Sequence, residues 1–268
     1  MVLAMRRVLV TGMSGLIGRA VRRRLEGRAV LRALNRRPVE GVETHRADIA
    51  DLQAIAPAFR DVDAVVHLAA NVETNPPIEA ITRDNVVGTY NVFEAARRAG
   101  VKRIVMATSN HAVGFYPRTQ TIDHRVVPRP DSRYGVSKAF SEALASLYAD
   151  KHGIGFLCTR IGNFGPKPID SRRLAIWISP RDYAQLVRIG LEHPDIRFEI
   201  VYGVSNNKRS WYDNANAYRL GYRPQDDSEP YAAAILAEEA GQPKDPVAER
   251  YQGGTFCAEE YSAETPPE

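Results

Sequence analysis

A tyrosine and a lysine four residues apart, in the stretch RPDSRYGVSKAF (residues 129–140), are the side chains best suited to chemistry. If this stretch opens a helix, both lie on one face, and the Lys138 ammonium can approach the Tyr134 phenol. A free tyrosine loses its proton near pH ~10, and a neighbouring cation favours the phenolate. The pair therefore indicates a general base. The same spacing arises in chains where neither residue is catalytic, so the rest of the sequence must decide.

A glycine-rich turn near the N-terminus provides the second indication. The apolar run RRVLVTG reads as a buried strand and leads directly into GMSGLIGRA, with glycines at positions 12, 15 and 18. In such a strand-to-helix turn the first glycine permits a tight bend and the second lets backbone amides approach a pyrophosphate. The third allows close packing of the helix on the sheet. The turn predicts dinucleotide binding, although glycines can also merely shape a turn.

The elements that must position these residues follow an alternating pattern. Apolar runs that predict strands lie at 6–12, 29–37, 63–70, 102–109, 155–163 and 197–204. Helical patterns lie between them, including one from the tyrosine to about His152 and one that Ser179 caps, with Pro180 at its first position. This alternation predicts an α/β fold, a Rossmann-like doubly wound parallel sheet with a small C-terminal substrate-binding portion.

We expect one domain spanning residues 1–268. Residues 1–161 are expected to form mainly the dinucleotide-binding core, and 162–268 mainly the substrate-binding part and a tail. The segment 162–173 reads as a loop, and the tail from about Gln225 has weak patterning.

Composition limits the class of protein. The chain has 268 residues, of which 44% are hydrophobic and 25% charged, with a formal charge of +4, which fits a globular protein and gives no case for nucleic acid. Cys158 and Cys257 are far apart and indicate neither a metal site nor a disulfide framework. No apolar run approaches the about 18 residues that would span a bilayer, and the start does not read as a signal peptide. We expect a cytoplasmic protein, without a membrane partner, that forms a homo-oligomer.

Several motifs in order resemble a known superfamily. The glycine turn, HLAA (67–70), ATSNH (107–111) and YGVSK (134–138) resemble the extended short-chain dehydrogenase/reductase superfamily over nearly the whole chain. SNHAVGFYP, RIG, VYGVSNN, WYDN and YQGGTF are most similar to uronate dehydrogenase. The resemblance implies oxidation of a uronic acid at its anomeric carbon, with hydride transfer to a nicotinamide cofactor, giving an aldonolactone.

The resemblance also implies catalytic roles. Tyr134 would be the acid/base that takes the proton of the anomeric hydroxyl. Lys138 would hold the nicotinamide ribose and lower the pKa of the tyrosine. Ser109 would hydrogen-bond the reacting oxygen, although Thr108 or Asn110 takes its place if the strand register is shifted.

The cofactor site implied by the glycine turn and the resemblance includes residues from several strand ends. Asp48 and Ile49 would flank the adenine, and HLAA would line the middle of the cofactor. The full set is Gly12, Met13, Ser14, Gly15, Leu16, Ile17, Gly18, Asn35, Arg36, Arg37, Asp48, Ile49, Leu68, Ala69, Ala70, Asn85, Tyr134, Lys138 and Ile161.

The residues at the end of the second predicted strand indicate which dinucleotide binds. There an NAD enzyme places an acid for the ribose hydroxyls, whereas this chain has Asn35 followed by Arg36 and Arg37. An amide does not repel a 2′-phosphate, and guanidinium groups can bind one. We therefore expect NADP to be favoured, with NAD possible; the alternative is that both arginines are solvated and either cofactor is accepted.

The substrate site implied by the resemblance contains a cation for the carboxylate. Arg172 matches the family's arginine better than the adjacent Arg173, and a guanidinium can bind a carboxylate through two parallel hydrogen bonds. Val72 and Asn163 stand where the family has serines, which leaves the identity of the sugar open. The expected set is Asn71, Val72, Ser109, Asn110, His111, Asn163 and Arg172, with no metal ligand.

Three alternatives remain at this point. The chain could oxidise another aldose or a sugar phosphate. It could be a nucleotide-sugar epimerase or dehydratase, although similar enzymes have a larger C-terminal region than the one left after the core sheet. A non-enzymatic dinucleotide sensor fits less well, since a sensor has no need of the tyrosine, lysine and serine set.

Overall fold

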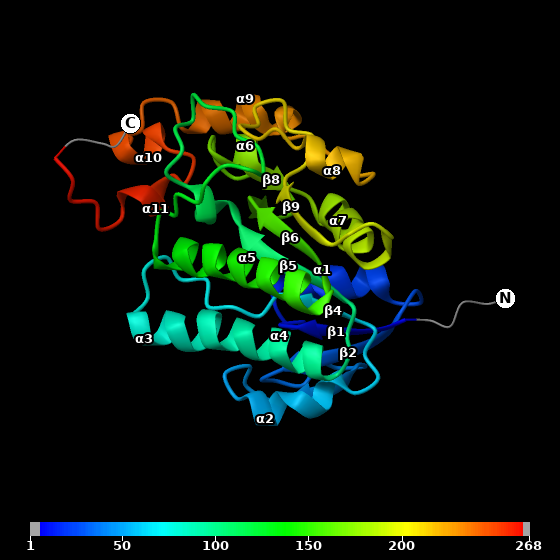
Figure 1. Cartoon of the computed structure of the whole chain (residues 1–268). Helices are drawn as coiled ribbons and strands as arrows, with labels where there is room; N and C mark the ends of the chain where they lie inside the picture. Colours follow the sequence, from blue (N-terminus) through cyan, green and yellow to red (C-terminus); the bar gives the residue numbers. More distant parts are fainter. Residues whose placement is uncertain (1–5, 265–268) are drawn as a thin grey trace.

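Seven parallel strands form the central sheet of the computed structural model, which describes residues 6–264 (Figure 1). Their order is β3-β2-β1-β4-β5-β6-β9. The order reverses at β1, which pairs with β2 on one side and with β4 on the other. In doubly wound sheets ligands bind beyond the carboxyl ends of the strands at such a reversal. The strands are β1 (Arg7–Thr11), β2 (Val30–Asn35), β3 (Glu43–Arg46), β4 (Ala64–His67), β5 (Arg103–Ser109), β6 (Gly155–Ile161) and β9 (Phe198–Gly203), and a small separate pair joins β7 (Asn163–Phe164) to β8 (Trp177–Ile178).

Helices cover both faces of the sheet, which confirms the predicted fold class. In Figure 1 the long helices α4 and α5 lie side by side across one face, while α1 and α7 lie behind the sheet. The helices are α1 (Leu16–Leu25), α2 (Leu52–Ile55), α3 (Ile78–Ile81), α4 (Gly88–Arg98), α5 (Arg133–His152), α6 (Arg173–Ile176), α7 (Pro180–Glu192), α8 (Ala215–Arg219), α9 (Glu229–Glu238), α10 (Pro246–Arg250) and α11 (Thr255–Ala258), with the 3₁₀ turns η1 (Ala56–Phe59) and η3 (Asn110–Val113) and the π-helical turn η2 (Thr82–Val87).

Two apolar cores lie on opposite faces of the sheet. Val8 and Val10 of β1 belong to the core beneath α1 and α7, whereas Leu9 between them belongs to the core beneath α4 and α5. Alternate residues of a strand point to opposite faces, so a strand covered on both sides must be apolar throughout. This explains why the strands read as continuous apolar runs.

The start of α5 is fixed by a cap. The Ser132 hydroxyl accepts a hydrogen bond from the Gly135 backbone N–H at 3.0 Å, and the helix ends at Gly153, whose φ is +66°. Serine is a preferred N-cap, and glycine adopts the left-handed conformation that ends many helices. The tyrosine and lysine therefore lie in the first two turns of a helix, as predicted.

Several elements of the structure were not predicted. The strand β3 was missed because its residues, ETHR, lack an apolar pattern and lie at the edge of the sheet. The tail beyond residue 225 contains α9, α10 and α11, and the supposed loop at 162–173 includes β7 and the start of α6. These short elements are held by contacts distant in sequence, which local patterns do not reveal.

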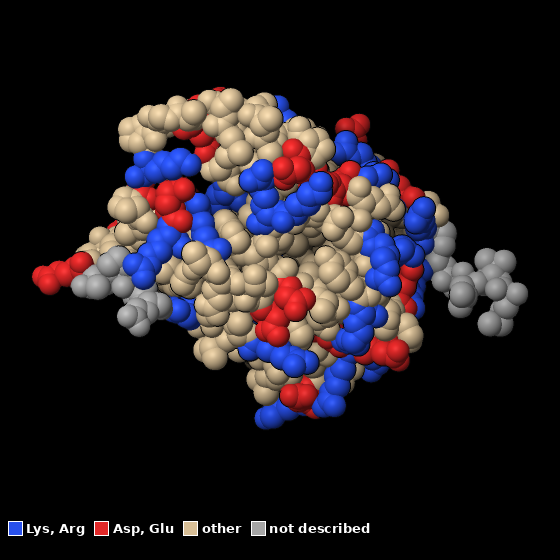
Figure 2. Space-filling view, turned by 90° about the horizontal axis from the view of Figure 1, so that it is seen from above, with Lys and Arg blue, Asp and Glu red and all other residues tan. Residues whose placement is uncertain are grey.

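The surface carries charges of both signs. On the face seen in Figure 2, Lys and Arg are interspersed with Asp and Glu. None of the helices within residues 6–264 is both long enough and apolar enough to cross a membrane.

Candidate active site

The structure brings the tyrosine, the lysine and the serine together at the carboxyl end of β5. Ser109 is the last residue of that strand, and its hydroxyl lies in hydrogen-bond contact with the Tyr134 phenol. The Lys138 ammonium lies 5.4 Å from the centroid of the tyrosine ring and donates to the Ala107 carbonyl oxygen at 3.0 Å. The strand end and the first turns of α5 thus assemble this group.

The expected effect of the lysine on the tyrosine is not what the structure shows. Burial raises the pKa of Tyr134 to about 12, and the nearby Asp131 charge acts in the same direction, against the lowering effect of the Ser109 hydrogen bond. Burial also lowers the pKa of Lys138 to about 8. The lysine therefore does not by itself make the phenol a strong base, because the buried phenolate loses more hydration than the distant ammonium returns.

Thr108, one of the two residues considered in place of Ser109, forms its hydrogen bond on the other side of the strand. There its hydroxyl donates to the buried Glu142 carboxylate at 3.0 Å. Glu142 also forms two hydrogen bonds with the buried Arg160 guanidinium, at 3.0 and 2.9 Å. Asn110 is fully buried and lies against Tyr212. Ser109 is the one of the three that contacts the tyrosine hydroxyl.

The glycine turn fits a bound dinucleotide. Gly12 has a φ of +68°, and a Cβ atom there would lie 2.9 Å from the Ala69 backbone nitrogen. At Gly18 a Cβ atom would lie 2.5 Å from the Gly12 carbonyl oxygen, so the helix approaches the turn as closely as it can. Within the described residues, no side chain caps the N-terminus of α1 at Gly15 and no acid lies in its first turn. The exposed start of this helix can therefore take an anionic group.

The sequence reasoning missed the residue that joins β1 to the HLAA segment. The Thr11 hydroxyl oxygen accepts hydrogen bonds from the Leu68 and Ala69 backbone N–H groups, each at 3.1 Å. Its own proton then goes to His67 Nδ1 at 2.7 Å, so the histidine carries its proton on Nε2, 3.4 Å from the Thr89 hydroxyl. Burial, with a further contribution from the Lys138 charge, lowers the pKa of His67 to about 3. The "H" of HLAA is thus a neutral structural residue.

The end of β2 carries the amide and the arginines expected at the adenosine ribose. The Asn35 side-chain amide donates to the Ser14 hydroxyl at 2.9 Å and to the Arg37 carbonyl oxygen at 3.0 Å, so it links β2 to the glycine turn. Arg36 and Arg37 are exposed. Asp48 forms an ion pair with Arg83; its burial favours a higher pKa, but the Ala50 backbone N–H, Arg83 and Arg36 together lower it.

A second amide connects the middle of the expected cofactor site to α5. Asn85, buried in the π-helical turn η2, accepts from the Asn71 backbone N–H at 2.7 Å and donates to the Asn71 carbonyl oxygen at 2.9 Å. It also donates to the Ser137 hydroxyl, which in turn donates to the Tyr134 carbonyl oxygen. The pairing fixes the segment after HLAA against the helix that bears the tyrosine.

The remaining predicted residues lie around the same strand ends. Ile161 ends β6 beside Ser109 of β5, and Ile49 packs against Gly88. Val72 is exposed, with 68% of its surface accessible, and Asn163 lies in the small β7–β8 pair. Met13 is fully buried, while Leu16 at the start of α1 is exposed.

The two adjacent arginines are distinguished by their partners. Arg173 forms an ion pair with Asp170, although its buried Nε atom has no hydrogen-bond partner among residues 6–264. Arg172 forms a hydrogen bond from Nε to the Gln252 carbonyl oxygen at 2.8 Å, and its buried Nη2 has no partner among residues 6–264. Burial lowers the pKa of Arg172. A buried guanidinium nitrogen without an acceptor is costly unless a ligand supplies one, and Arg172, unlike Arg173, has no carboxylate partner among the described residues, so it is the stronger candidate to bind an anion.

The C-terminal segment closes this part of the site. Gly254 has a φ of +67°, and a Cβ atom there would lie 2.5 Å from Arg172 Cδ. Phe256 stacks on the His111 ring at 3.8 Å between centroids, and the His111 ring lies 6.0 Å from that of Tyr134. Sequence reasoning assigned no role to this segment, whose YQGGTF motif was the only signal.

Further polar atoms near Arg172 lack partners. The Asn110 Nδ2 atom and the Gln252 Oε1 atom are buried without a hydrogen-bond partner in the described part of the chain. The Tyr212 hydroxyl is buried beside Asn110 and interacts electrostatically with Arg172. Because buried polar groups are rarely left unpaired, this cluster of donors and acceptors is suited to a polar ligand with several hydroxyls.

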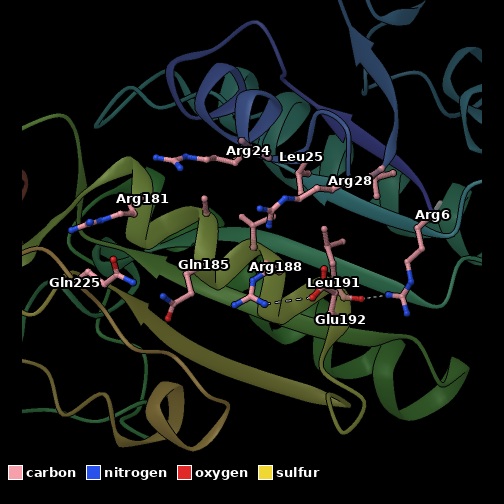
Figure 3. Close-up of a pocket in the computed structure, with 15 residues that line it drawn as sticks. Arg6, Arg24, Leu25, Arg28, Arg181, Gln185, Arg188, Leu191, Glu192 and Gln225 are labelled. Carbon is pink, nitrogen blue, oxygen red and sulfur yellow. Dashed lines mark hydrogen bonds and ion pairs between the residues drawn. The ribbon is translucent and has the colours of Figure 1, made fainter. Parts of the chain in front are cut away.

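A large cavity lies elsewhere. It has a volume of about 750 Å³, lies between α1 and α7, and is lined by arginines that include Arg24 and Arg28 (Figure 3). Two further lining arginines have acidic partners, Arg181 with Asp226 and Arg188 with Glu192. None of the residues expected in the active site lines it, so its size does not make it the reaction site.

Comparisons with known proteins agree with this arrangement. Residues 8–219 match the model of the "NAD dependent epimerase/dehydratase family". A uronate dehydrogenase from Pseudomonas putida is 42% identical, with 94% of this chain and 95% of that protein covered. A crystal structure of a uronate dehydrogenase mutant from Agrobacterium tumefaciens complexed with NAD has a TM-score of 0.89 at 38% identity, covering 95% of this chain and 98% of that one. An NAD-dependent glucose-6-phosphate dehydrogenase from Haloferax volcanii is 38% identical, with 82% of this chain and 94% of that protein covered.

The resemblance to uronate dehydrogenase inferred from the motifs is thereby confirmed. The family model spans more than half of the chain, and the similarity to the Pseudomonas putida protein covers nearly all of it. The chain belongs to the NAD dependent epimerase/dehydratase family.

Proposed function

We propose that this protein is a uronate dehydrogenase, which oxidises the anomeric carbon of a uronic acid with a nicotinamide dinucleotide and releases an aldonolactone. The observation that carries the proposal is Arg172, a partly buried arginine whose Nη2 atom is buried without a hydrogen-bond partner and which has no acidic ion-pair partner among residues 6–264. Arg172 contacts Gly254, and two residues further along the chain Phe256 stacks on the His111 ring, which lies next to Tyr134. A cation on this side of the base is suited to a sugar substrate that carries a carboxylate.

The chemistry proposed for the chain's own residues follows from their positions. Arg172 binds the carboxylate, and Ser109 donates a hydrogen bond to the reacting oxygen while Tyr134 takes its proton. When bound, an oxidised nicotinamide supplies the hydride acceptor and a positive charge that favours the phenolate. Lys138 binds the ribose and keeps the local potential positive. Because burial raises the pKa of Tyr134, we expect the phenol to act as a base mainly when cofactor and substrate are bound.

The test is formation of reduced cofactor, followed by absorbance, with a panel of uronates, neutral aldoses and sugar phosphates. We expect turnover of at least one uronate with a kcat/KM well above that of the aldose of the same configuration. Preference for a sugar phosphate or a neutral aldose would contradict the proposal. Product analysis by NMR should show a lactone, since no water is required for the oxidation itself.

We further propose that NADP is favoured over NAD. Asn35 replaces an acid that would repel a 2′-phosphate, and the exposed Arg36 and Arg37 follow it immediately. The relative from Agrobacterium tumefaciens was solved with NAD, so the proposal predicts a difference between the two proteins. The measurement is the ratio of kcat/KM with NADP and NAD at one ionic strength, for the parent and for Arg36→Ala. A parent that prefers NAD, or an unchanged ratio in the variant, would contradict it.

The division of the chain and its assembly are also proposals. Residues 1–161 would bind mainly the dinucleotide, and 162–268 mainly the substrate, within one domain in which β9 of the second part joins the sheet. Exposed apolar side chains on the neighbouring helices α4 and α5, Tyr90, Val136 and Leu147, support a homo-oligomer. Sedimentation should show a single assembly that Leu147→Glu weakens; a monomeric parent would contradict this. The two buried free thiols are consistent with a cytoplasmic location.

A further inference from the structure

The His111 ring is held by neighbouring side chains, and in the part of the chain that the structure describes only its Nε2 atom is left for a further contact. Phe256 stacks on one face, and the Tyr134 ring meets it edge-on. Its Nδ1 atom lies 2.6 Å from the Asp131 Oδ2 atom. An ionised carboxylate only accepts hydrogen bonds, so the proton lies on Nδ1 and Nε2 keeps its lone pair. Nε2 has no partner among the residues that the structure describes, 6–264.

The Asp131 carboxylate is enclosed by three glycine-bearing segments, two of which are distant from it in sequence. A Cβ atom at Gly114 would lie 1.8 Å from Asp131 Oδ2, and one at Gly253 would lie 2.1 Å from the same atom. At Gly135 it would lie 3.1 Å from Oδ1. A side chain at Gly114 or Gly253 would therefore displace the carboxylate, whereas one at Gly135 would first clash with the His111 carbonyl oxygen, 2.3 Å from the added Cβ atom. The other carboxylate oxygen, Oδ1, accepts a hydrogen bond from the Ser132 hydroxyl at 2.8 Å.

The charges around the pair keep the ring neutral. Burial lowers the pKa of His111 against the opposing effect of Asp131, and the positive charges of Arg172 and Arg173 add to the lowering. A protonated ring would present an N–H group at Nε2. The neutral ring presents an acceptor at Nε2 instead: burial and the two arginines disfavour the protonated ring, and the Asp131 carboxylate fixes the remaining proton on Nδ1.

We propose that Asp131 is a positioning residue that holds His111 with Nε2 as an acceptor for a sugar hydroxyl. This inference rests on the proposed function. The ring centroids of His111 and Tyr134 are 6.0 Å apart. Because Tyr134 acts at the anomeric hydroxyl, the hydroxyl that donates a hydrogen bond to Nε2 belongs to a carbon close to the anomeric one. The histidine thereby helps to set which face of the sugar meets the base. A substrate without that hydroxyl leaves the lone pair unpaired.

The variant Asp131→Asn tests the arrangement with little change in size. Ser132 donates to Oδ1, so the amide oxygen takes that place and the amide NH₂ group faces His111 Nδ1. The amide then donates to Nδ1, and the ring proton moves to Nε2. We expect two-bond ¹H–¹⁵N NMR spectra of the histidine rings to show the Nδ1–H tautomer for His111 in the parent and the Nε2–H tautomer in Asp131→Asn. An unchanged tautomer would overturn the proposal.

A double-mutant cycle separates positioning from structure. Asp131→Asn should lower kcat/KM for the uronate by about tenfold or more, mainly through KM, because a donor replaces an acceptor, and cofactor affinity should not change. In a His111→Ala background the same substitution should have no further effect, because the residue through which Asp131 acts is gone. An equal loss in both backgrounds would mean that the carboxylate is merely structural.

The matched control is Ser132→Ala. It removes the hydrogen bond to Oδ1 and the cap of α5 but leaves the contact with His111. It should lower thermal stability without changing the ratio of kcat/KM for the uronate and its deoxy analogues, whereas Asp131→Asn should compress that ratio. If the parent oxidises no uronate, the proposed function fails, and the tautomer spectra still decide whether Asp131 holds His111 as described.

Discussion

The strongest test of the substrate site is replacement of Arg172 by alanine. Its Nε is committed to the Gln252 carbonyl oxygen, which leaves the two Nη atoms for a ligand, and Nη2 is buried without a partner among residues 6–264. Hydrogen bonds to charged groups contribute about 1.5–3 kcal/mol each. Two parallel bonds to a carboxylate would thus contribute about 3–6 kcal/mol before the hydration of the free carboxylate is taken into account.

The measurable loss is smaller than that sum. Water can enter the space that the side chain leaves, so we expect a cost of about 2–4 kcal/mol in transition-state binding, equivalent to a roughly 30- to 1,000-fold lower kcat/KM for the uronate. Any activity on the neutral aldose of the same configuration should fall far less. Arg172→Lys should lie between the two, because an ammonium keeps the charge but not the paired donors.

The adjacent Arg173 provides a control of the same type. It is paired with Asp170, so Arg173→Ala should affect stability slightly and leave the preference for the uronate over the aldose unchanged. The assay is initial-rate kinetics with both substrates at saturating cofactor, together with thermal unfolding of each variant. Equal losses on uronate and aldose in Arg172→Ala, or the same change of preference in Arg173→Ala, would refute the assignment of Arg172 to the carboxylate.

Two further predictions concern the catalytic group and stability. Tyr134→Phe should reduce turnover by at least ~100-fold and leave cofactor binding, measured by fluorescence titration, nearly unchanged. Lys138→Ala should impair both turnover and cofactor binding. Near-normal turnover of Tyr134→Phe would remove the tyrosine from the mechanism. The pKa of His67 falls from 6.5 in the unfolded chain to about 3 in the folded protein, so the unfolded state takes up the proton first as the pH falls below 6.5. The free energy of unfolding should therefore decrease by about 2 kcal/mol between pH 7 and pH 5 on account of this residue, and His67→Gln should lose that part of the acid sensitivity in denaturant titrations; an unchanged pH dependence would contradict the reasoning.

Sequence by itself determined the features that depend on near neighbours. The apolar runs and the glycine spacing predicted the parallel sheet and the dinucleotide turn, because a strand covered on both faces must be apolar and a turn at Gly12 and Gly18 admits no side chain. The i and i+4 spacing placed Tyr134 and Lys138 on one helix face, since the Ser132 cap fixes where that helix begins. These constraints act within a few residues of the chain and can be read from it.

Tertiary structure decided which of those residues are available for chemistry. Two adjacent arginines look alike in sequence, and only the fold pairs Arg173 with Asp170 and places Arg172, which has no such carboxylate partner among residues 6–264, against Gly254. Nothing in the sequence indicated a role for Asp131, which only the fold brings to His111. The pKa of Tyr134 was likewise misjudged, because burial is a property of everything packed around a group and not of its neighbours along the chain.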